Sequence, residues 1–197
     1  MVRRERVTGR TTWQPLLMVS VLVVILFTPF TAAGATTAAN RAFLDAAFEG
    51  DTKAVEILLA EGVDVNFKDG IGFTALFGAA RSGHTETVKL LLARGANPNV
   101  ELPTSGTTAL MYAALNGHND IVVALLENGA EVNAKNKRGI TSLMYAAYGG
   151  RSQVAQTLLA KGAEINVKDN EGLTALEYAE TTHHDEVGRI LKKAGAK

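Results

Sequence analysis

A short run of residues recurs at nearly constant intervals along this chain. Its copies begin at Thr74, Thr108, Thr141 and Thr174, in steps of 34, 33 and 33 residues. The first copy reads Thr-Ala-Leu-Phe-Gly-Ala-Ala and the second reads Thr-Ala-Leu-Met-Tyr-Ala-Ala. A fixed period of this length is typical of architectures in which similar units stack side by side. The period therefore predicts a stacked repeat fold, and such folds usually work through a shared surface rather than a catalytic pocket.

Each period also carries residues that start and stop helices. In the unit that begins at Thr74, the threonine can cap a helix by accepting a backbone N–H. Gly83 then permits a sharp turn, and an apolar stripe ends in the pair Leu91-Leu92. Gly95 suits the left-handed conformation that ends a helix, and Asn99 closes the unit. The unit is therefore predicted to be a turn, a helix, a turn, a second helix and an extended finger.

This unit resembles the ankyrin repeat, a unit of 33 residues marked by the stretch Thr-Pro-Leu-His-x-Ala. The chain departs from that stretch by carrying Ala or Ser in place of Pro. In place of His it has Phe77, Met111, Met144 and Glu177. A fifth unit precedes the other four in the same register, with Arg41 where Thr is expected. The resemblance implies an all-α ankyrin-repeat solenoid of about five helix-turn-helix repeats with β-turn fingers, at about residues 36–68, 69–102, 103–135, 136–168 and 169–197.

Residues 1–35 have the layout of an export signal. Four arginines precede the apolar run Leu16 to Phe27, and Ala33-Gly34-Ala35 fits an A-x-A cleavage site. We expect a signal peptide over 1–35 and an exported ankyrin repeat domain over 36–197 in the bacterial periplasm. An uncleaved anchor is the alternative, because the looser apolar run 13–30 approaches the roughly 20 residues that span a bilayer. The chain would then be a single-pass inner-membrane scaffold; a secreted protein is a further alternative.

The composition argues against several classes of function. The chain has no cysteine, which excludes disulfides and thiolate metal sites. Its formal charge is zero, and without residues 1–35 it is −3, so no basic groove for nucleic acid is indicated. No nucleophile motif or glycine-rich phosphate loop occurs. We therefore expect no enzyme activity, no cofactor and a monomer.

Histidine is the remaining candidate for chemistry. His84, His118 and His184 hold equivalent positions in different units, and stacked helices lie roughly 8–10 Å apart. That spacing is too wide for one zinc ion, whose ligands lie at about 2.1 Å. We expect these residues to be structural. A metal-binding or accessory role for His183-His184 is the alternative hypothesis.

The resemblance implies a protein partner that is bound through the concave face and the finger tips. The residue after the His position supplies a tyrosine row, Tyr112, Tyr145 and Tyr178, which we expect to be exposed. Tyrosine is enriched at interface hot spots, although these rings could instead pack between repeats. The finger over 100–107 holds one extra residue and, with Lys137-Arg138, is expected to frame the centre of the site. The predicted partner-binding residues are Arg81, Thr104, Ser105, Tyr112, Leu115, Lys137, Arg138, Tyr145, Tyr148 and Tyr178.

Overall fold

The computed structural model describes residues 33–197, and this part of the chain forms one compact unit of ten helices. Its only β-type pairing is an isolated antiparallel bridge between Glu101 and Thr108. None of the described helices is long and apolar enough to cross a membrane. The predicted signal peptide lies outside the described residues, except for positions 33–35, which begin the first helix.

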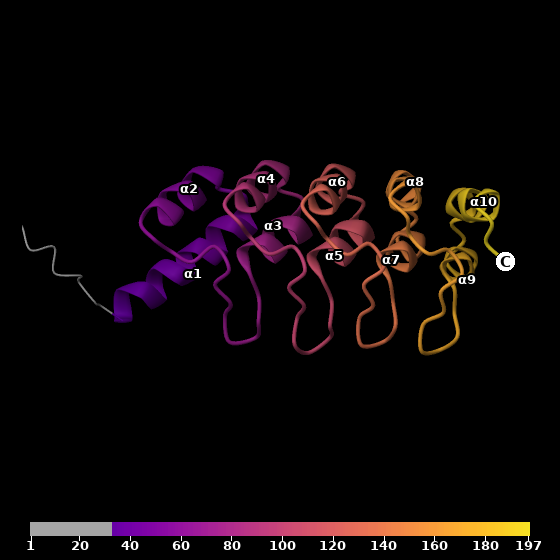
Figure 1. Cartoon of the computed structure of the whole chain (residues 1–197), viewed down its shortest axis with the longest axis horizontal. Coiled ribbons are helices and arrows are strands. Elements are labelled where there is room, and N and C mark those ends of the chain that lie inside the picture. The colour runs from indigo at the N-terminus through magenta and orange to yellow at the C-terminus, as the bar shows by residue number, and fades with distance from the viewer. Residues whose placement is uncertain (1–32) are drawn as a thin grey trace, which may run out of the picture. The chain divides into compact units, whose positions relative to one another are not determined.

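The helices alternate between two layers (Figure 1). The first helix of each repeat belongs to one layer: α1 (Ala33–Glu49), α3 (Ala75–Ser82), α5 (Ala109–Asn116), α7 (Ser142–Tyr148) and α9 (Ala175–Thr181). The second helices form the other layer: α2 (Thr52–Ala60), α4 (Thr85–Ala93), α6 (Asn119–Glu127), α8 (Ser152–Ala160) and α10 (Asp185–Lys193). Successive helices contact one another within each layer. The five helix pairs confirm the predicted all-α solenoid, and we number them repeats 1 to 5.

Extended fingers connect each repeat to the next and project from the layer of first helices (Figure 1). We define finger 1 as residues 66–73, finger 2 as 99–107, finger 3 as 133–140 and finger 4 as 166–173. Each finger leads into a threonine that caps the following helix. The Thr74 hydroxyl accepts the N–H of Phe77 at 3.2 Å, and Thr174 accepts that of Glu177 at 3.3 Å. These bonds confirm the capping role predicted for the recurring threonine.

The first repeat differs from the others at this point. Its α1 has 17 residues, whereas the other first helices have seven or eight. Arg41 occupies the position of the capping threonine, and no finger precedes it. No threonine caps a helix that would begin at residue 42. Instead α1 begins earlier, at Ala33, and lies beside finger 1. The missing threonine therefore marks the start of the stack, as the sequence predicts, and lengthens its first helix.

The asparagine that closes each unit ties neighbouring repeats together. Asn99 donates from Nδ2 to the carbonyl of Gly129 at 2.8 Å, and its Oδ1 accepts the N–H of Glu131 at 2.9 Å. Asn66, Asn133 and Asn166 make the same pair of bonds to the repeat that follows each of them. A single side chain thus satisfies both a backbone donor and a backbone acceptor of the next repeat.

The core runs continuously between the two layers. Leu91, Leu125, Leu158 and Leu191 recur once in each of repeats 2 to 5 and are fully buried, whereas the equivalent Leu58 of repeat 1 is half-buried. The second leucine of each pair is less buried, and at the C-terminal end Lys192 replaces it and is exposed. This exposed lysine agrees with the polar C-terminal cap expected of a terminal repeat.

Candidate functional site

The predicted tyrosine row lies on the first helices, but its rings are half-buried where the sequence predicted exposed ones. Tyr112, Tyr145 and Tyr178 lie on α5, α7 and α9 and pack against the hydrophobic core. Helical spacing correctly placed them on one face of the first layer. It did not show how far these rings would be packed against the core.

Two of these tyrosines fasten a finger to its helix. Asn136 donates from Nδ2 to the Tyr145 hydroxyl at 3.1 Å, and Tyr178 donates its hydroxyl to Asp169 Oδ2 at 2.6 Å. The remaining side-chain oxygen of Asp169 accepts two backbone N–H groups of its own finger, both at 2.9 Å. Asn136 holds finger 3 in the same way. Asp169 therefore bonds within its own turn, as Asn136 does.

These contacts shift the pKa values of Tyr178 and Asp169 in opposite directions. Burial, together with the hydrogen bond to Asp169, raises the pKa of Tyr178 to about 12. Burial acts to raise the pKa of Asp169 as well. The hydrogen bonds from Tyr178 and from the backbone of Leu173 and Glu171 outweigh it, so that the pKa falls below the ordinary value. At neutral pH the pair is a phenol that donates to a carboxylate, which is a structural contact.

Tyr112 has a different environment because finger 2 lacks the Asx residue. Leu102 stands at that position, and the longer finger closes instead through the Leu102 carbonyl, which accepts the N–H of Gly106 at 2.7 Å. The Tyr112 ring packs edge-on against Phe77 with centroids 5.1 Å apart. The Arg81 guanidinium lies over the same ring, 5.5 Å from its centroid, a cation–π distance. The structure therefore brings two predicted site residues, Arg81 and Tyr112, into contact.

Tyr148 is the most exposed of the four tyrosines, at 53%. Its ring meets that of Tyr178 edge-on, with centroids 6.3 Å apart. A hollow of about 300 Å³ opens between repeats 4 and 5 beside these two rings. Its other lining residues are Arg138, Ile140, Met144 and Tyr145. Arg138 pairs with Glu171 at 2.8 Å across the finger tips. Four of the predicted site residues therefore converge on one apolar hollow with a charged rim.

Fingers 2 and 3 are joined at their tips. The N–H of Lys137 donates to the Ser105 carbonyl at 2.9 Å, and its ammonium group donates to the Pro103 carbonyl at 2.5 Å. Thr104 is exposed beside them. Leu115 is half-buried, and its carbonyl accepts from Arg151 Nε at 2.9 Å. The predicted residues of these two fingers thus form a rigid rim, whereas Leu115 also joins repeat 3 to repeat 4.

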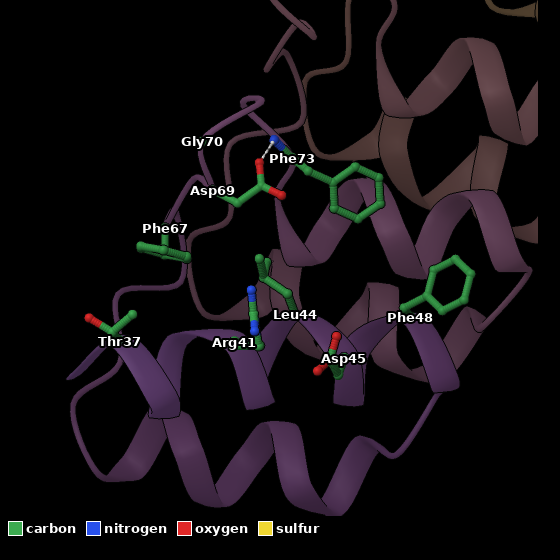
Figure 2. A pocket seen from close by; sticks show the side chains of 9 residues that line it. All are labelled: Thr37, Arg41, Leu44, Asp45, Phe48, Phe67, Asp69, Gly70 and Phe73. Carbon is green, nitrogen blue, oxygen red and sulfur yellow. Dashed lines mark hydrogen bonds between the residues drawn. The ribbon is translucent and has the colours of Figure 1, made fainter. Parts of the chain in front are cut away.

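A second hollow lies at the N-terminal end of the stack, between α1 and finger 1 (Figure 2). It measures about 360 Å³, and the sequence analysis missed it. Phe48, Phe67 and Phe73 line it. The residues equivalent to Phe67 in the later repeats are Val or Ala. This local excess of aromatic residues is the sequence signal that could have indicated the hollow.

His84, His118 and His184 lie at interfaces between repeats. His84 forms a hydrogen bond of 2.9 Å between its Nε2 and the Phe48 carbonyl of the preceding repeat. His118 and His184 lie against the turn glycines Gly83 and Gly150. In the described residues no group of three or more His, Asp or Glu side chains could hold a metal ion.

Two family models match the sequence. The model for ankyrin repeats in three copies matches residues 43–136, and the model for ankyrin repeats in many copies matches residues 125–179. Together the matches extend over most of the described chain, from α1 to α9. No curated protein matches the sequence at a significant level.

Proposed function

The chain belongs to the ankyrin repeat family, and on that premise we propose that it binds its partner protein through the concave face and finger tips of repeats 2 to 5, in the bacterial periplasm. Ankyrin repeats are protein–protein interaction modules and generally act as non-catalytic scaffolds. Beyond this general role, we propose which surface binds the partner and in which compartment. The surface comprises the ten residues predicted from the sequence.

The observation that carries this proposal is the hollow beside Tyr148. An exposed aromatic ring next to a partly apolar hollow is the arrangement in which interface hot spots occur. The Tyr148 hydroxyl is not used to hold a finger, unlike those of Tyr145 and Tyr178. Arg138, which pairs with Glu171, supplies a charged rim beside the apolar lining, which agrees with the usual anatomy of a protein interface.

The surface can be tested by photocrosslinking in the native cell. A photoreactive phenylalanine analogue replaces Tyr148 in the full chain, and the matched control carries it at Gln153, an exposed residue of α8 in the other layer. We expect a discrete protein adduct from position 148 and none of the same mass from position 153. Adducts from Gln153 alone would show that the partner binds the opposite face.

The compartment rests on the layout of residues 1–35 and has its own test. We expect the protein purified from the native cell envelope to begin near Thr36 and to fractionate with periplasmic proteins. A chain that begins at Met1 and sediments with the inner membrane would replace the periplasmic proposal with the membrane-tethered scaffold. The result does not affect the test of the surface.

A further inference from the structure

Among the described residues, 33–197, finger 1 has no finger on its N-terminal side, whereas each later finger does. Lys137 and Asn170 are equivalent residues of fingers 3 and 4. Each donates its backbone N–H to the preceding finger, to the carbonyls of Ser105 at 2.9 Å and Arg138 at 3.0 Å. The equivalent residue of finger 1 is Gly70, and no described residue accepts its N–H. Gly70 therefore presents a backbone donor of the type that pairs with another extended segment.

Asp69 lacks the phenol that its counterpart Asp169 binds. Its Oδ1 accepts the backbone N–H groups of Ile71 at 2.9 Å and Phe73 at 2.8 Å, as in finger 4. The tyrosine that would reach Oδ2 is replaced by Gly78. Figure 2 shows the carboxylate beside the groove, with its one drawn hydrogen bond going to Phe73. The second oxygen is left without a tyrosine partner and can accept from a group in the groove.

The walls of the groove are mainly apolar. Phe67 and Phe73 come from finger 1, and Leu44 and Phe48 come from one stripe of α1 (Figure 2). Phe48 is 47% exposed, so that much of its side chain is open to solvent beside the groove. The extension of α1 beyond the length of the other first helices adds Thr37 and Arg41 to the lining. A volume of about 360 Å³ is large enough for an aromatic or long aliphatic side chain and the backbone that carries it.

The charged groups of the groove are unequal in number. Asp45 on α1 and Asp69 on finger 1 supply two carboxylates, and Arg41 supplies one guanidinium group. Asp69 lines the groove and uses Oδ1 for its own finger, which leaves Oδ2 for a group in the groove. The excess of negative charge favours a cationic side chain in the occupant.

We propose that this groove binds an extended peptide segment of a partner protein in which a Lys or Arg adjoins an aromatic or long aliphatic residue. The segment takes the place that a preceding finger would have. Its backbone carbonyl accepts from the Gly70 N–H, its apolar side chain packs between Phe67 and Leu44, and its cation pairs with Asp69 and Asp45. The groove is separate from the Tyr148 hollow and adds a second binding region to the one proposed above.

The test selects peptides without assuming a sequence. A phage library of random 12-residue peptides is panned on the immobilised full-length protein. The most enriched peptide is synthesised with a fluorescent label, and its dissociation constant is measured by fluorescence anisotropy. We expect the enriched sequences to share a Lys or Arg next to an aromatic or long aliphatic residue. Replacing that Lys or Arg by Glu should weaken binding at least tenfold.

The chain offers matched variants for each contact. Asp69→Asn keeps the oxygen that holds the finger, as Asn136 does in finger 3, but removes the charge. Phe67→Val installs the residue found at the equivalent position 167. We expect each variant to bind the peptide about tenfold more weakly and to melt within a few degrees of the wild type.

The backbone donor is tested at Gly70. A Cβ added there meets no atom within 4 Å, so Gly70→Ala should bind the peptide like the wild type. Gly70→Pro removes the N–H, as Pro103 does in finger 2, and should weaken binding about fivefold. Circular dichroism checks that both variants fold.

Three results would overturn the proposal. The first is a library that yields no binding peptide or only peptides without the paired cation and apolar residue. The second is binding that Phe67→Val and Asp69→Asn leave unchanged. The third is binding that falls only with Tyr148→Ala, which would place the peptide on the tyrosine surface. That third result would support the Tyr148 surface and exclude the groove as the peptide site. The two proposals can therefore be refuted independently.

Discussion

Two left-handed glycines of the first repeat differ in a way that isolates the contact between repeats. Gly50 and Gly62 have φ values of 81° and 94°, so alanine is strained at both positions. A Cβ on Gly62 meets no atom within 4 Å. A Cβ on Gly50 would overlap the His84 ring of the next repeat, with Cγ at 2.6 Å and Cε1 at 2.7 Å. Both substitutions therefore strain the backbone, and only Gly50→Ala also creates a steric overlap with the His84 ring.

The shared cost is the left-handed backbone of alanine, about 1 kcal/mol. At Gly50 the ring must also move, which adds about 1 kcal/mol of overpacking. Moving the ring forfeits the 2.9 Å hydrogen bond between His84 Nε2 and the Phe48 carbonyl, worth about 1 kcal/mol. We therefore expect Gly62→Ala to lower the free energy of unfolding by about 1 kcal/mol and Gly50→Ala by about 3 kcal/mol.

Urea denaturation followed by circular dichroism at 222 nm measures both values. A double-mutant cycle then assigns the difference. In the background His84→Ala, the ring is gone and Gly50→Ala should cost only about 1 kcal/mol, so that the coupling energy is about 2 kcal/mol. Equal costs at Gly50 and Gly62 in the wild-type background would refute the steric argument. A cost at Gly50 that persists without His84 would refute the assignment to this ring.

Further predictions concern pH and the core. Because the pKa of Asp169 is lowered by folding, its contribution to stability is present above the unfolded value near 3.8 and is lost as the pH falls through the folded value. The urea midpoint should therefore fall less between pH 5 and pH 2.5 in Asp169→Asn than in the wild type, and an equal fall in both would contradict this. Because the pKa of Tyr178 is raised to about 12, stability should decline from about pH 10 to pH 12 as the unfolded chain loses this proton first. Absorbance at 295 nm should show a late phenolate step that Tyr178→Phe removes; a step that persists in that variant would contradict the assignment. Leu125→Ala empties a fully buried position and should cost about 3 kcal/mol in urea denaturation. Ile57→Ala, at a position that is 58% exposed, should cost less than about 1 kcal/mol, and similar losses in the two variants would contradict the burial argument.

Much of the fold could be predicted because its signals are local and repeated. Thr74 caps α3, and Gly95 adopts the left-handed conformation after α4, as their positions in the period indicate. Asn99 was recognised only as a recurring residue. Its role requires the next repeat, because both of its partners lie about 30 residues further along the chain. The identity of such a partner does not follow from local propensity.

The candidate site was predictable in its position but not in its exposure. The spacing placed Tyr145 and Tyr178 on one face of the first helices. Their hydroxyl groups bond to Asn136 and Asp169, nine residues earlier in each case, and their rings pack against the core. The hollow beside Tyr148 is lined by residues of repeats 4 and 5 together. Whether these residues bind a partner stays a prediction.

The sequence by itself determined the repeat, its helices and the face on which the tyrosines lie, because caps, turns and helical spacing act over a few residues. The tertiary structure decided which of these side chains are free. The Tyr178 hydroxyl is hydrogen-bonded to Asp169. Asp69 has no equivalent tyrosine partner, because Gly78 stands at that position. The N-terminal groove forms where finger 1 packs beside α1, whose extension contributes Thr37 and Arg41 to the lining. Exposure and hollows depend on the distances between segments that are remote in sequence, and only the packed chain sets those distances.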